Sequence, residues 1–368
     1  MSDKLLKYKI GISLIPGIGS ILAKKIIAYT GGIESVFMES KRSLLKIPGI
    51  GEQLANAIAN QKVLDIAEEE VQFIAKNKIN ALFYLDKEYP ERLRHCIDAP
   101  VMLYAKGDID LNQPKVLTIV GTRNASQYGK EICNKLVYDL TDRNHKVIIV
   151  SGLAYGIDVC AHKAALKNKL QTVAVLGHGL ATIYPYLHKP IARSICKQGA
   201  LISDFTSKTK VEKKNFIKRN RIIAGLSDAT IIIESGEKGG ALITADIANS
   251  YNRDVFAIPG RVKDTYSIGC NRLIKSNKAA LIESVRDLEY IMGWDAPTKK
   301  GIPRQKQLFI ELSPEEKLIL DLLKEEDLTI DTICLRSDLP VSKVSPMLLN
   351  LEFSGLLKSL PGKVYSLN

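Results

Sequence analysis

Residues 147–158 read VIIVSGLAYGID, an apolar β-branched run that passes directly into a turn of glycines and small residues. The same order recurs at residues 116–123, where VLTIV is followed by Gly121-Thr122-Arg123. Amphipathic stretches separate these runs from further short apolar runs at 172–176, 201–202, 230–233 and 255–258. Strand-like runs that alternate with helical stretches predict an α/β fold with a doubly wound, mostly parallel sheet.

Ligands of such sheets bind at the carboxyl ends of the strands, so the residues after each run are the first candidates for a site. Glycines and a serine at these ends predict a backbone-lined anion pocket, into which Arg123 reaches. Its candidate residues are Gly121, Ser151, Gly152, Gly177, Gly179, Gly239 and Gly240. The sequence has no GxGxxG followed by an acidic residue at the required distance, and no GxxxxGK[ST]. It therefore does not support dinucleotide or P-loop nucleotide binding.

Residues 205–221 read FTSKTKVEKKNFIKRNR and carry seven Lys or Arg, one Glu and the aromatic Phe216. Cations neutralise phosphates and an aromatic ring stacks on a base, so this composition favours a nucleic-acid strand as ligand. A solvated basic loop is the alternative interpretation. The glycine-rich turns on either side favour the nucleic-acid site.

Asp158 and His162 are four residues apart, on one face of a predicted helix. They could form an acid–base pair, but no third group completes a catalytic set. We therefore favour a helix-start carboxylate and a structural histidine.

The formal charge of +12 is unevenly distributed along the 368 residues. Residues 1–61 carry eight bases and four acids, whereas residues 312–368 carry six bases and nine acids. The middle of the chain therefore holds most of the positive charge, and it is the expected binding region for a polyanion.

The six cysteines are scattered, with no CxxC and no histidine cluster, so we expect neither a metal site nor a disulfide framework. Ile10–Ala23 is apolar and follows lysines, but Pro16-Gly17 interrupts it and no cleavage site follows. Because no apolar run approaches about 20 residues, the expected location is the cytoplasm.

The N-terminal segment contains an internal repeat. Ile15-Pro-Gly-Ile-Gly19 recurs as Ile47-Pro-Gly-Ile-Gly51, each between two apolar helical stretches. The pattern resembles a tandem helix-hairpin-helix module in residues 1–61, with residues 62–79 as a connecting helix. Such modules grip the DNA backbone at hairpins, here at Gly17, Gly19, Gly49 and Gly51. A packing or protein-contact role is the alternative.

Residues 296–311 are rich in proline, glycine and lysine and predict a linker. In residues 312–368, helices from Ser313 to Leu323, from Ile330 to Ser337 and from Pro340 onward precede a predicted two-stranded wing. This is the order of a winged-helix domain. The third helix offers only Lys343 and Asn350 for base contacts, in an acidic domain, so we favour a protein-contact role over DNA reading.

The middle of the chain resembles the DNA-processing protein DprA/Smf family over about 200 residues. The motifs that carry the resemblance are VGTR at 120–123, SGLAYGID at 151–158, AVLGHG at 174–179, Tyr184-Pro185, Phe216, RNRIIAG at 219–225, LITA at 242–245 and Pro259-Gly260. The sequence departs from the family pattern at Asp204, at Gly239-Gly240-Ala241 and at Lys278-Ala279.

The resemblance implies an extended Rossmann-like domain over residues 80–295 that binds single-stranded DNA and forms a homodimer. It implies a protein that is not an enzyme and that loads the RecA recombinase during natural transformation and homologous recombination. Carried over by motif, the DNA-binding residues are Arg123, Lys213, Phe216, Arg219, Asn220 and Arg221. No cofactor is implied.

Two other functions are alternatives to this one. Rossmann-like phosphoribohydrolases share glycine-rich strand ends, but they carry a PGGxGT motif followed by a catalytic glutamate. The matching stretch here, residues 236–244, reads GEKGGALIT, and the glutamate is missing. A repair nuclease would require an Asp/Glu cluster spaced for two metals, and the sequence has none.

Overall fold

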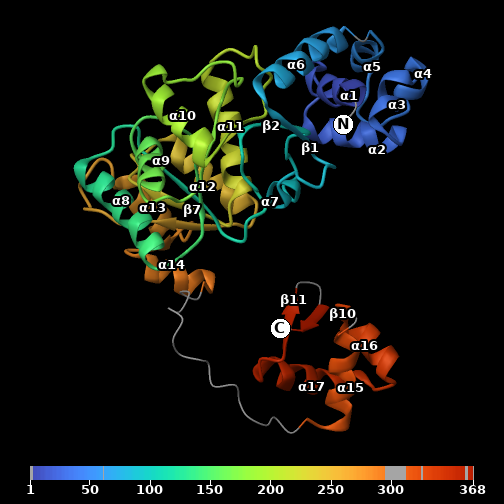
Figure 1. Cartoon of the computed structure of the whole chain (residues 1–368), viewed down its shortest axis with the longest axis vertical. Helices are drawn as coiled ribbons and strands as arrows, with labels where there is room; N and C mark the ends of the chain where they lie inside the picture. Colours follow the sequence, from blue (N-terminus) through green and yellow to red (C-terminus); the bar gives the residue numbers. More distant parts are fainter. Residues whose placement is uncertain (1–2, 61, 295–311, 325, 361–363, 368) are drawn as a thin grey trace. The chain divides into compact units, whose positions relative to one another are not determined.

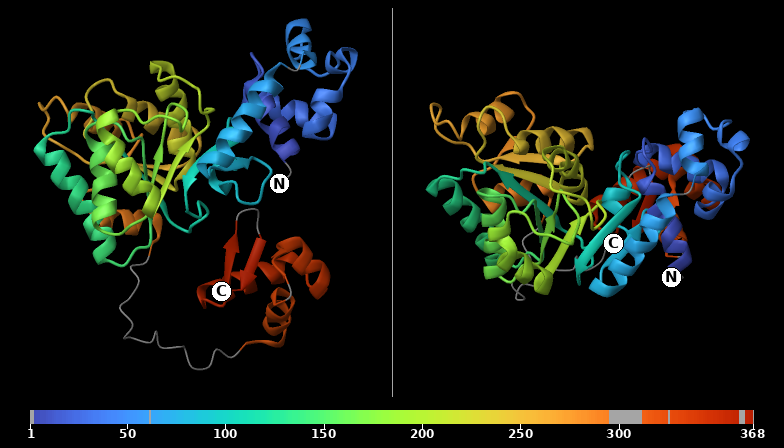
Figure 2. Two further views of the ribbon diagram at one scale, coloured as in Figure 1. Left: turned by 45° about the horizontal axis from the view of Figure 1, so that its top comes forward. Right: turned by 90° about the horizontal axis from the view of Figure 1, so that it is seen from above.

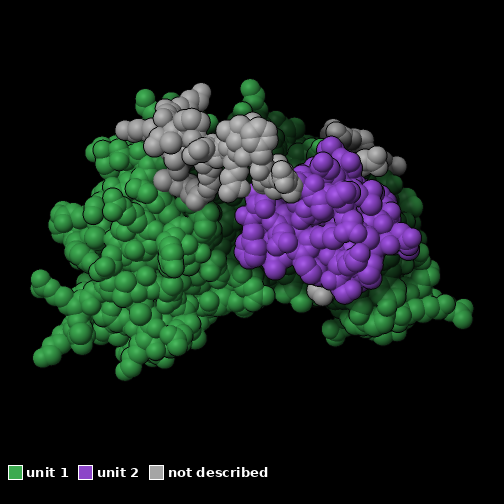
Figure 3. All heavy atoms as spheres, turned by 90° about the horizontal axis from the view of Figure 1, so that it is seen from below, with its two compact units in different colours: residues 1–297 green, residues 298–368 purple. Residues whose placement is uncertain are grey.

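The computed structural model of the chain describes residues 3–60, 62–294, 312–324, 326–360 and 364–367 (Figure 1). The chain divides into two compact units, Met1–Pro297 and Thr298–Asn368, coloured separately in Figure 3. None of the helices in the described ranges is both long and apolar enough to cross a membrane. The predicted linker at 296–311 lies outside the described residues.

A nine-stranded sheet forms the centre of the first unit. Its strands are β1 (Asn80–Phe83), β2 (Met102–Gly107), β3 (Val116–Gly121), β4 (Ile148–Ser151), β5 (Thr172–Val175), β6 (Gly199–Ser203), β7 (Ala229–Ile233), β8 (Asp254–Ala257) and β9 (Ala280–Leu281). All six predicted strands are present, with ends shifted by one or two residues. The strands β1, β2 and β9 were not predicted.

The strand order is β1-β2-β6-β5-β4-β3-β7-β8-β9. Every pair from β6 to β9 is parallel, whereas β1 with β2 and β2 with β6 are antiparallel. The prediction of a large, mostly parallel sheet is therefore confirmed. The chain order reverses direction between β3 and β7, and this switch point is where α/β sheets offer a crevice for ligands.

Helices cover both faces of the sheet, as Figure 2 shows. One core is shared with α11 (Lys213–Leu226), α12 (Gly240–Ser250) and α13 (Ile268–Lys275). The opposite core is shared with α8 (Gln127–Asp142), α9 (Ile157–Lys167) and α14 (Val285–Met292). Because both faces are buried, the central strands consist of continuous apolar runs. A short helix, α7 (Glu91–Arg94), and the segment η1 (Tyr186–His188) with α10 (Lys189–Gln198) complete this part.

Six helices precede the sheet: α1 (Asp3–Leu14), α2 (Ser20–Thr30), α3 (Ile33–Met38), α4 (Lys41–Leu44), α5 (Glu52–Ala59) and α6 (Val63–Asn77). The repeat segments form the turns before α2 and α5. Gly17 and Gly49 adopt φ of +83° and +96°, which favours glycine. The two turns pack reciprocally, since a Cβ atom at Gly17 would meet Leu54 of α5 and one at Gly49 would meet Leu22 of α2.

The second unit contains α15 (Pro314–Leu323), α16 (Ile330–Ser337) and α17 (Val341–Phe353). Its sheet has three strands in the order β10-β12-β11, namely β10 (Leu328–Thr329), β11 (Leu357–Leu360) and β12 (Val364–Leu367). Ser313 caps α15 in a capping box with Glu316, and Pro314 occupies the first turn. The strand β10 was not predicted, and residues 361–363, between the two strands of the predicted wing, lie outside the described residues.

Candidate nucleic-acid interface

The carboxyl ends of β3, β4 and β5 lie side by side because these strands are parallel neighbours. The turns that follow them begin at Thr122, Gly152 and Leu176, and the basic helix α11 packs against the same three strands. The structure thus brings the glycine-rich turns and the start of α11 together, as the sequence predicted from strand order.

Phe216 lies in the first turn of α11, directly over the turn after β5. A Cβ atom at Gly177 would lie 2.8 Å from Phe216 Cδ1 and 3.1 Å from its Cα. The Phe216 ring is half-buried, and its centroid is 5.8 Å from the ring of Tyr184, which is 48% exposed. The two rings form an aromatic pair at the surface, suited to stacking on bases.

Arg219 is buried beneath this surface. Only 4% of the residue is exposed, and Nη1 donates to the carbonyl oxygen of Gly152 (2.8 Å) and to that of Val175. A Cβ atom at Gly152 would lie 2.6 Å from both the Arg219 guanidinium and the Asp158 carboxylate. Burial lowers the pKa of Arg219 to about 10, and the Asp158 charge opposes that shift. Arg219 therefore joins α11 to the ends of β4 and β5.

Asp158 and His162 are also buried. Burial raises the pKa of Asp158, against the effect of Arg219 and of backbone N–H groups that include the one donated by Gly152 (3.2 Å). His162 Nδ1 lies 2.7 Å from the Thr172 hydroxyl, and burial lowers its pKa to about 3. The two side chains have separate partners, in agreement with the structural interpretation favoured from the sequence.

Arg123 and Lys213 are exposed at this edge of the sheet. The positive charge of Arg123 contributes, after burial, to the lowered pKa of Arg219. Lys214 and Lys218 are exposed on α11 as well, and Lys214 pairs with Glu212 at 2.8 Å. Together with the Phe216–Tyr184 pair, these exposed cations make up the candidate site, which we call the DNA-binding surface after the ligand that the sequence predicts.

The other two predicted contact residues are engaged inside the protein. Arg221 pairs with Asp204 at 2.6 Å and donates to the carbonyl oxygen of Asp98. The Asn220 side chain is buried and donates to the carbonyl oxygen of Gly240 at 3.3 Å. Both hold α11 against its neighbours, so the structure gives a packing reason for them beside the predicted DNA contact.

Most of the predicted anion-pocket residues lie at close-packed strand ends. Gly152 and Gly177 lie under Arg219 and Phe216, Gly179 faces the backbone of residues 206–207, and the Ser151 hydroxyl donates to the carbonyl oxygen of Ile119. Gly121 lies against Ile157. Neighbouring atoms thus lie too close to these positions for a Cβ atom, and this close packing alone explains why they are glycines. Gly239 and Gly240 are instead exposed at the start of α12, where no side chain caps the helix.

The hairpin glycines occupy a separate surface. Gly19 and Gly51 are exposed, and a Cβ atom on either would meet nothing within 4 Å. Each precedes a helix that no side chain caps. Their predicted contact with a DNA backbone stays a prediction.

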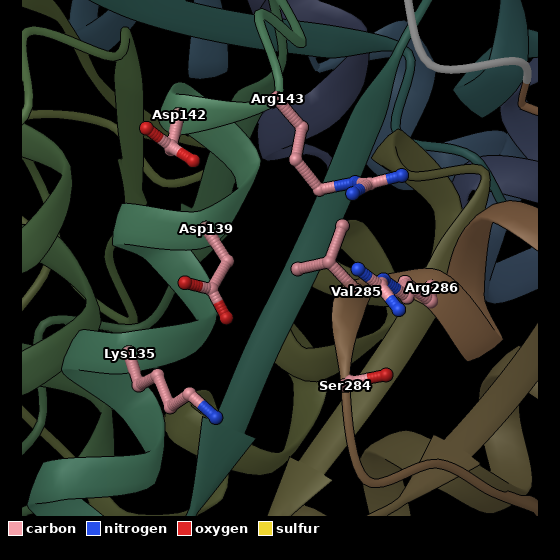
Figure 4. A pocket seen from close by; sticks show the side chains of 7 residues that line it. All are labelled: Lys135, Asp139, Asp142, Arg143, Ser284, Val285 and Arg286. Carbon is pink, nitrogen blue, oxygen red and sulfur yellow. The ribbon is translucent and has the colours of Figure 1, made fainter.

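The described residues also line two hollows. One, of about 390 Å³, lies between the end of α8 and the start of α14 and is lined by both acids and bases (Figure 4). Helix α8 starts at the carboxyl ends of the strands and runs antiparallel to them. The hollow at its far end therefore lies at the amino ends of the strands, away from the turns described above. Another, of about 370 Å³, lies beside α11 and is lined by Ile97, Asp98, Ile217, Lys218, Arg221, Ile247, Ser250 and Tyr251. Across the residues described, no group of three or more His, Cys, Asp or Glu could hold a metal.

Sequence reasoning did not select Tyr184 as a site residue, although Tyr184-Pro185 was among the family motifs. An exposed tyrosine next to proline in a strand-end loop was the available signal. Tyr184 becomes a candidate site residue only through its contact with Phe216, which the fold creates.

The family of the chain follows from comparison with known proteins. A family model for the DNA recombination-mediator protein A matches residues 80–292, more than half of the chain. The chain belongs to the DNA recombination-mediator protein A family. A second model, for the DprA winged helix domain, matches residues 304–363. The resemblance to DprA/Smf proteins and the prediction of a C-terminal winged helix are therefore confirmed. The family consists of recombination mediators, not enzymes.

Curated relatives agree with this membership. Protein Smf from Synechocystis sp. is 30% identical over 99% of both chains. DNA processing protein DprA from Bacillus subtilis is 40% identical over 55% of this chain and 68% of the relative.

Solved DprA structures share the fold. DprA from Streptococcus pneumoniae aligns with a TM-score of 0.65 and 33% identity, over 77% of this chain and 97% of that chain. DprA from Helicobacter pylori, described for its single-stranded DNA binding mode, aligns with a TM-score of 0.52 and 27% identity, over 58% and 95%.

Proposed function

We propose that this DprA-family chain binds single-stranded DNA on the DNA-binding surface and loads the RecA recombinase onto it. The observation that carries the proposal is the Phe216–Tyr184 pair, 5.8 Å between centroids, beside the exposed Arg123 and Lys213. Cations along a backbone and rings for the bases are the requirements of a single-strand site. The single-strand binding described for the Helicobacter pylori relative supports it.

The wider role follows the family. We propose that the protein acts in the cytoplasm in natural transformation and homologous recombination, as a homodimer through its Rossmann-like domain. The free edge strand β9, with Leu281 46% exposed, supports an interface in that domain. The departure at Lys278-Ala279 adjoins this strand.

We further propose the finer domain division stated above: a tandem helix-hairpin-helix domain at 1–61, a connecting helix at 62–79 and a Rossmann-like domain at 80–295. The linker at 296–311 and the winged helix at 312–368 complete it. The reciprocal packing of Gly17 on Leu54 and of Gly49 on Leu22 supports the tandem module. The acidic winged helix is proposed as a protein-contact module.

We expect the full chain to bind single-stranded DNA more tightly than duplex of the same length. Stacking on Phe216 and Tyr184 requires exposed bases, which a duplex does not offer. If about four to six phosphates are neutralised, log K should fall against log salt with a slope of roughly −3 to −4. Titrations of an oligo(dT) and a duplex at several salt concentrations measure both quantities. Tighter duplex binding, or a flat salt dependence, would refute the proposal.

Arg123→Ala and Lys213→Ala are each expected to weaken single-strand binding and to reduce the salt slope by about one. Both side chains are exposed, so the melting temperature should change little. The matched control is Lys135→Ala, which removes the same charge from an exposed position on the distant half of α8. Equal losses in all three variants would mean that net charge, not this surface, binds DNA.

A further inference from the structure

A carboxylate from the N-terminal helices holds the loop that leads into the basic helix. The loop, residues 204–212, joins β6 to α11. Glu70 of α6 accepts the Ser207 backbone N–H on Oε1 and Oε2 (2.9 and 3.0 Å) and the Ser207 hydroxyl on Oε2 (2.5 Å). Only 6% of Glu70 and 8% of Ser207 are exposed. In Figures 1 and 2, α6 lies beside the side of the sheet that β1 and β2 form.

Other contacts also attach the loop, among them the ion pairs Asp204–Arg221 (2.6 Å) and Lys208–Glu69. Thr209 donates its N–H to the Thr206 carbonyl oxygen (3.0 Å), and the carbonyl oxygen of Thr209 accepts from Gly179 at 3.4 Å. The carbonyl oxygen of Lys210 accepts from the Asn215 amide at 3.3 Å. These bonds shape the turn and attach its far end. The Glu70 bonds are charge-assisted and buried, and together with the Asp204–Arg221 pair (2.6 Å) at the start of the loop they are its main buried attachments among the described contacts.

The negative charge of Glu70 is unfavourable for binding a polyanion at this loop. The loop belongs to the most basic segment of the chain, where a polyanion is expected, and a carboxylate there repels phosphates. A buried carboxylate is stable only when hydrogen bonds satisfy it, and Ser207 supplies these donors. Its placement is explained by the conformation that it imposes on the loop, not by attraction of the ligand.

We infer that Glu70 is a positioning residue for single-stranded DNA binding: it fixes the loop so that α11 presents Lys213 and Phe216 to the strand. The inference rests on the proposed function. It makes the N-terminal helices part of the DNA-binding machinery without direct contact with the DNA. If the loop spends only a fraction of its time in the conformation that binds DNA, the apparent association constant equals the intrinsic one multiplied by that fraction.

The test is Glu70→Ala in the full chain. We expect oligo(dT) to bind about tenfold more weakly, because the loop loses its charge-assisted bonds. Simple electrostatics predicts the opposite sign, since the variant removes a negative charge near a polyanion. Limited trypsin digestion gives a second readout: cleavage after Lys208 and Lys210 should accelerate, while other sites and the melting temperature change little.

The matched control is Glu69→Ala, one residue earlier on α6. Glu69 is exposed and pairs with Lys208, so its removal should leave affinity unchanged or slightly raised, and the loop intact. Ser207→Ala keeps the backbone donor and loses the hydroxyl, so its effect should lie between those of the two glutamate variants.

The outcomes separate the inference from the proposed function. A wild-type chain that does not bind single strands overturns both. If the wild type binds, an unchanged or increased affinity of Glu70→Ala overturns the positioning role, whether or not the loop is cleaved faster. An equal loss in Glu69→Ala, or cleavage throughout the chain of Glu70→Ala, would also overturn it.

Discussion

Arg219→Ala is expected to lower the free energy of unfolding by about 3–5 kcal/mol, because it breaks a buried charge arrangement from one side. Asp158 would remain buried without the guanidinium that faces it, and the carbonyl oxygens of Gly152 and Val175 would lose their donor. Urea denaturation of the variant and the wild type at neutral pH measures the loss.

The control is the double variant Arg219→Ala/Asp158→Asn, which also removes the carboxylate charge. It should recover part of the lost stability, because the desolvated charge is then absent. A loss below about 1 kcal/mol, combined with weak DNA binding, would mean that Arg219 is free to contact DNA, as the sequence predicted.

The central strands were predictable because both of their faces are buried. Parallel strands covered by helices on two sides need apolar residues at every position, and β-branched residues suit them. The strands β1 and β2 escaped prediction because their sequences, NALF and MLYAKG, contain no β-branched residue. They pair antiparallel at one edge, and β9 at the other edge has only two residues.

The sequence predicts a binding role for the basic segment as a whole, and this prediction does not separate the residues of α11 by face. Asn215, Arg219, Ile222 and Leu226 follow one another at helical spacing and are all buried. That periodicity places Arg219 on the inner face of α11, beneath Phe216. The density of positive charge concealed it, because arginine in a basic run is ordinarily taken as exposed.

Other features have no local signal in the sequence. Glu70 and Ser207 are 137 residues apart, and nothing in either segment indicates the other. The aromatic pair of Tyr184 and Phe216 likewise depends on how the turn after β5 meets the start of α11. Such contacts are consequences of tertiary packing, and only the folded chain reveals them.

Phe216→Ala is expected to weaken single-strand binding by about 1–3 kcal/mol, whereas Phe216→Tyr should bind nearly as the wild type. Stacking needs a π-face, and tyrosine retains it while alanine does not. Fluorescence anisotropy with a labelled oligo(dT) measures both affinities. Tyr184→Ala is the companion variant. If the two rings form one stacking platform, Tyr184→Ala should also weaken binding of oligo(dT). The double variant should then lose less binding free energy than the two single variants added together.

The same ring also packs on Gly177, so stability must be measured on the same proteins. A fully buried phenylalanine replaced by alanine costs about 3–5 kcal/mol, and a half-buried one should cost clearly less. Tyrosine at a buried position would be costly, because its hydroxyl would need a partner. If Phe216→Ala melts at a much lower temperature, Phe216→Tyr is destabilised as well and the folded fraction of each binds oligo(dT) normally, then Phe216 is a core residue. In that case the bases must stack elsewhere on the DNA-binding surface, and Tyr184 alone would be left as an exposed ring beside Arg123 and Lys213.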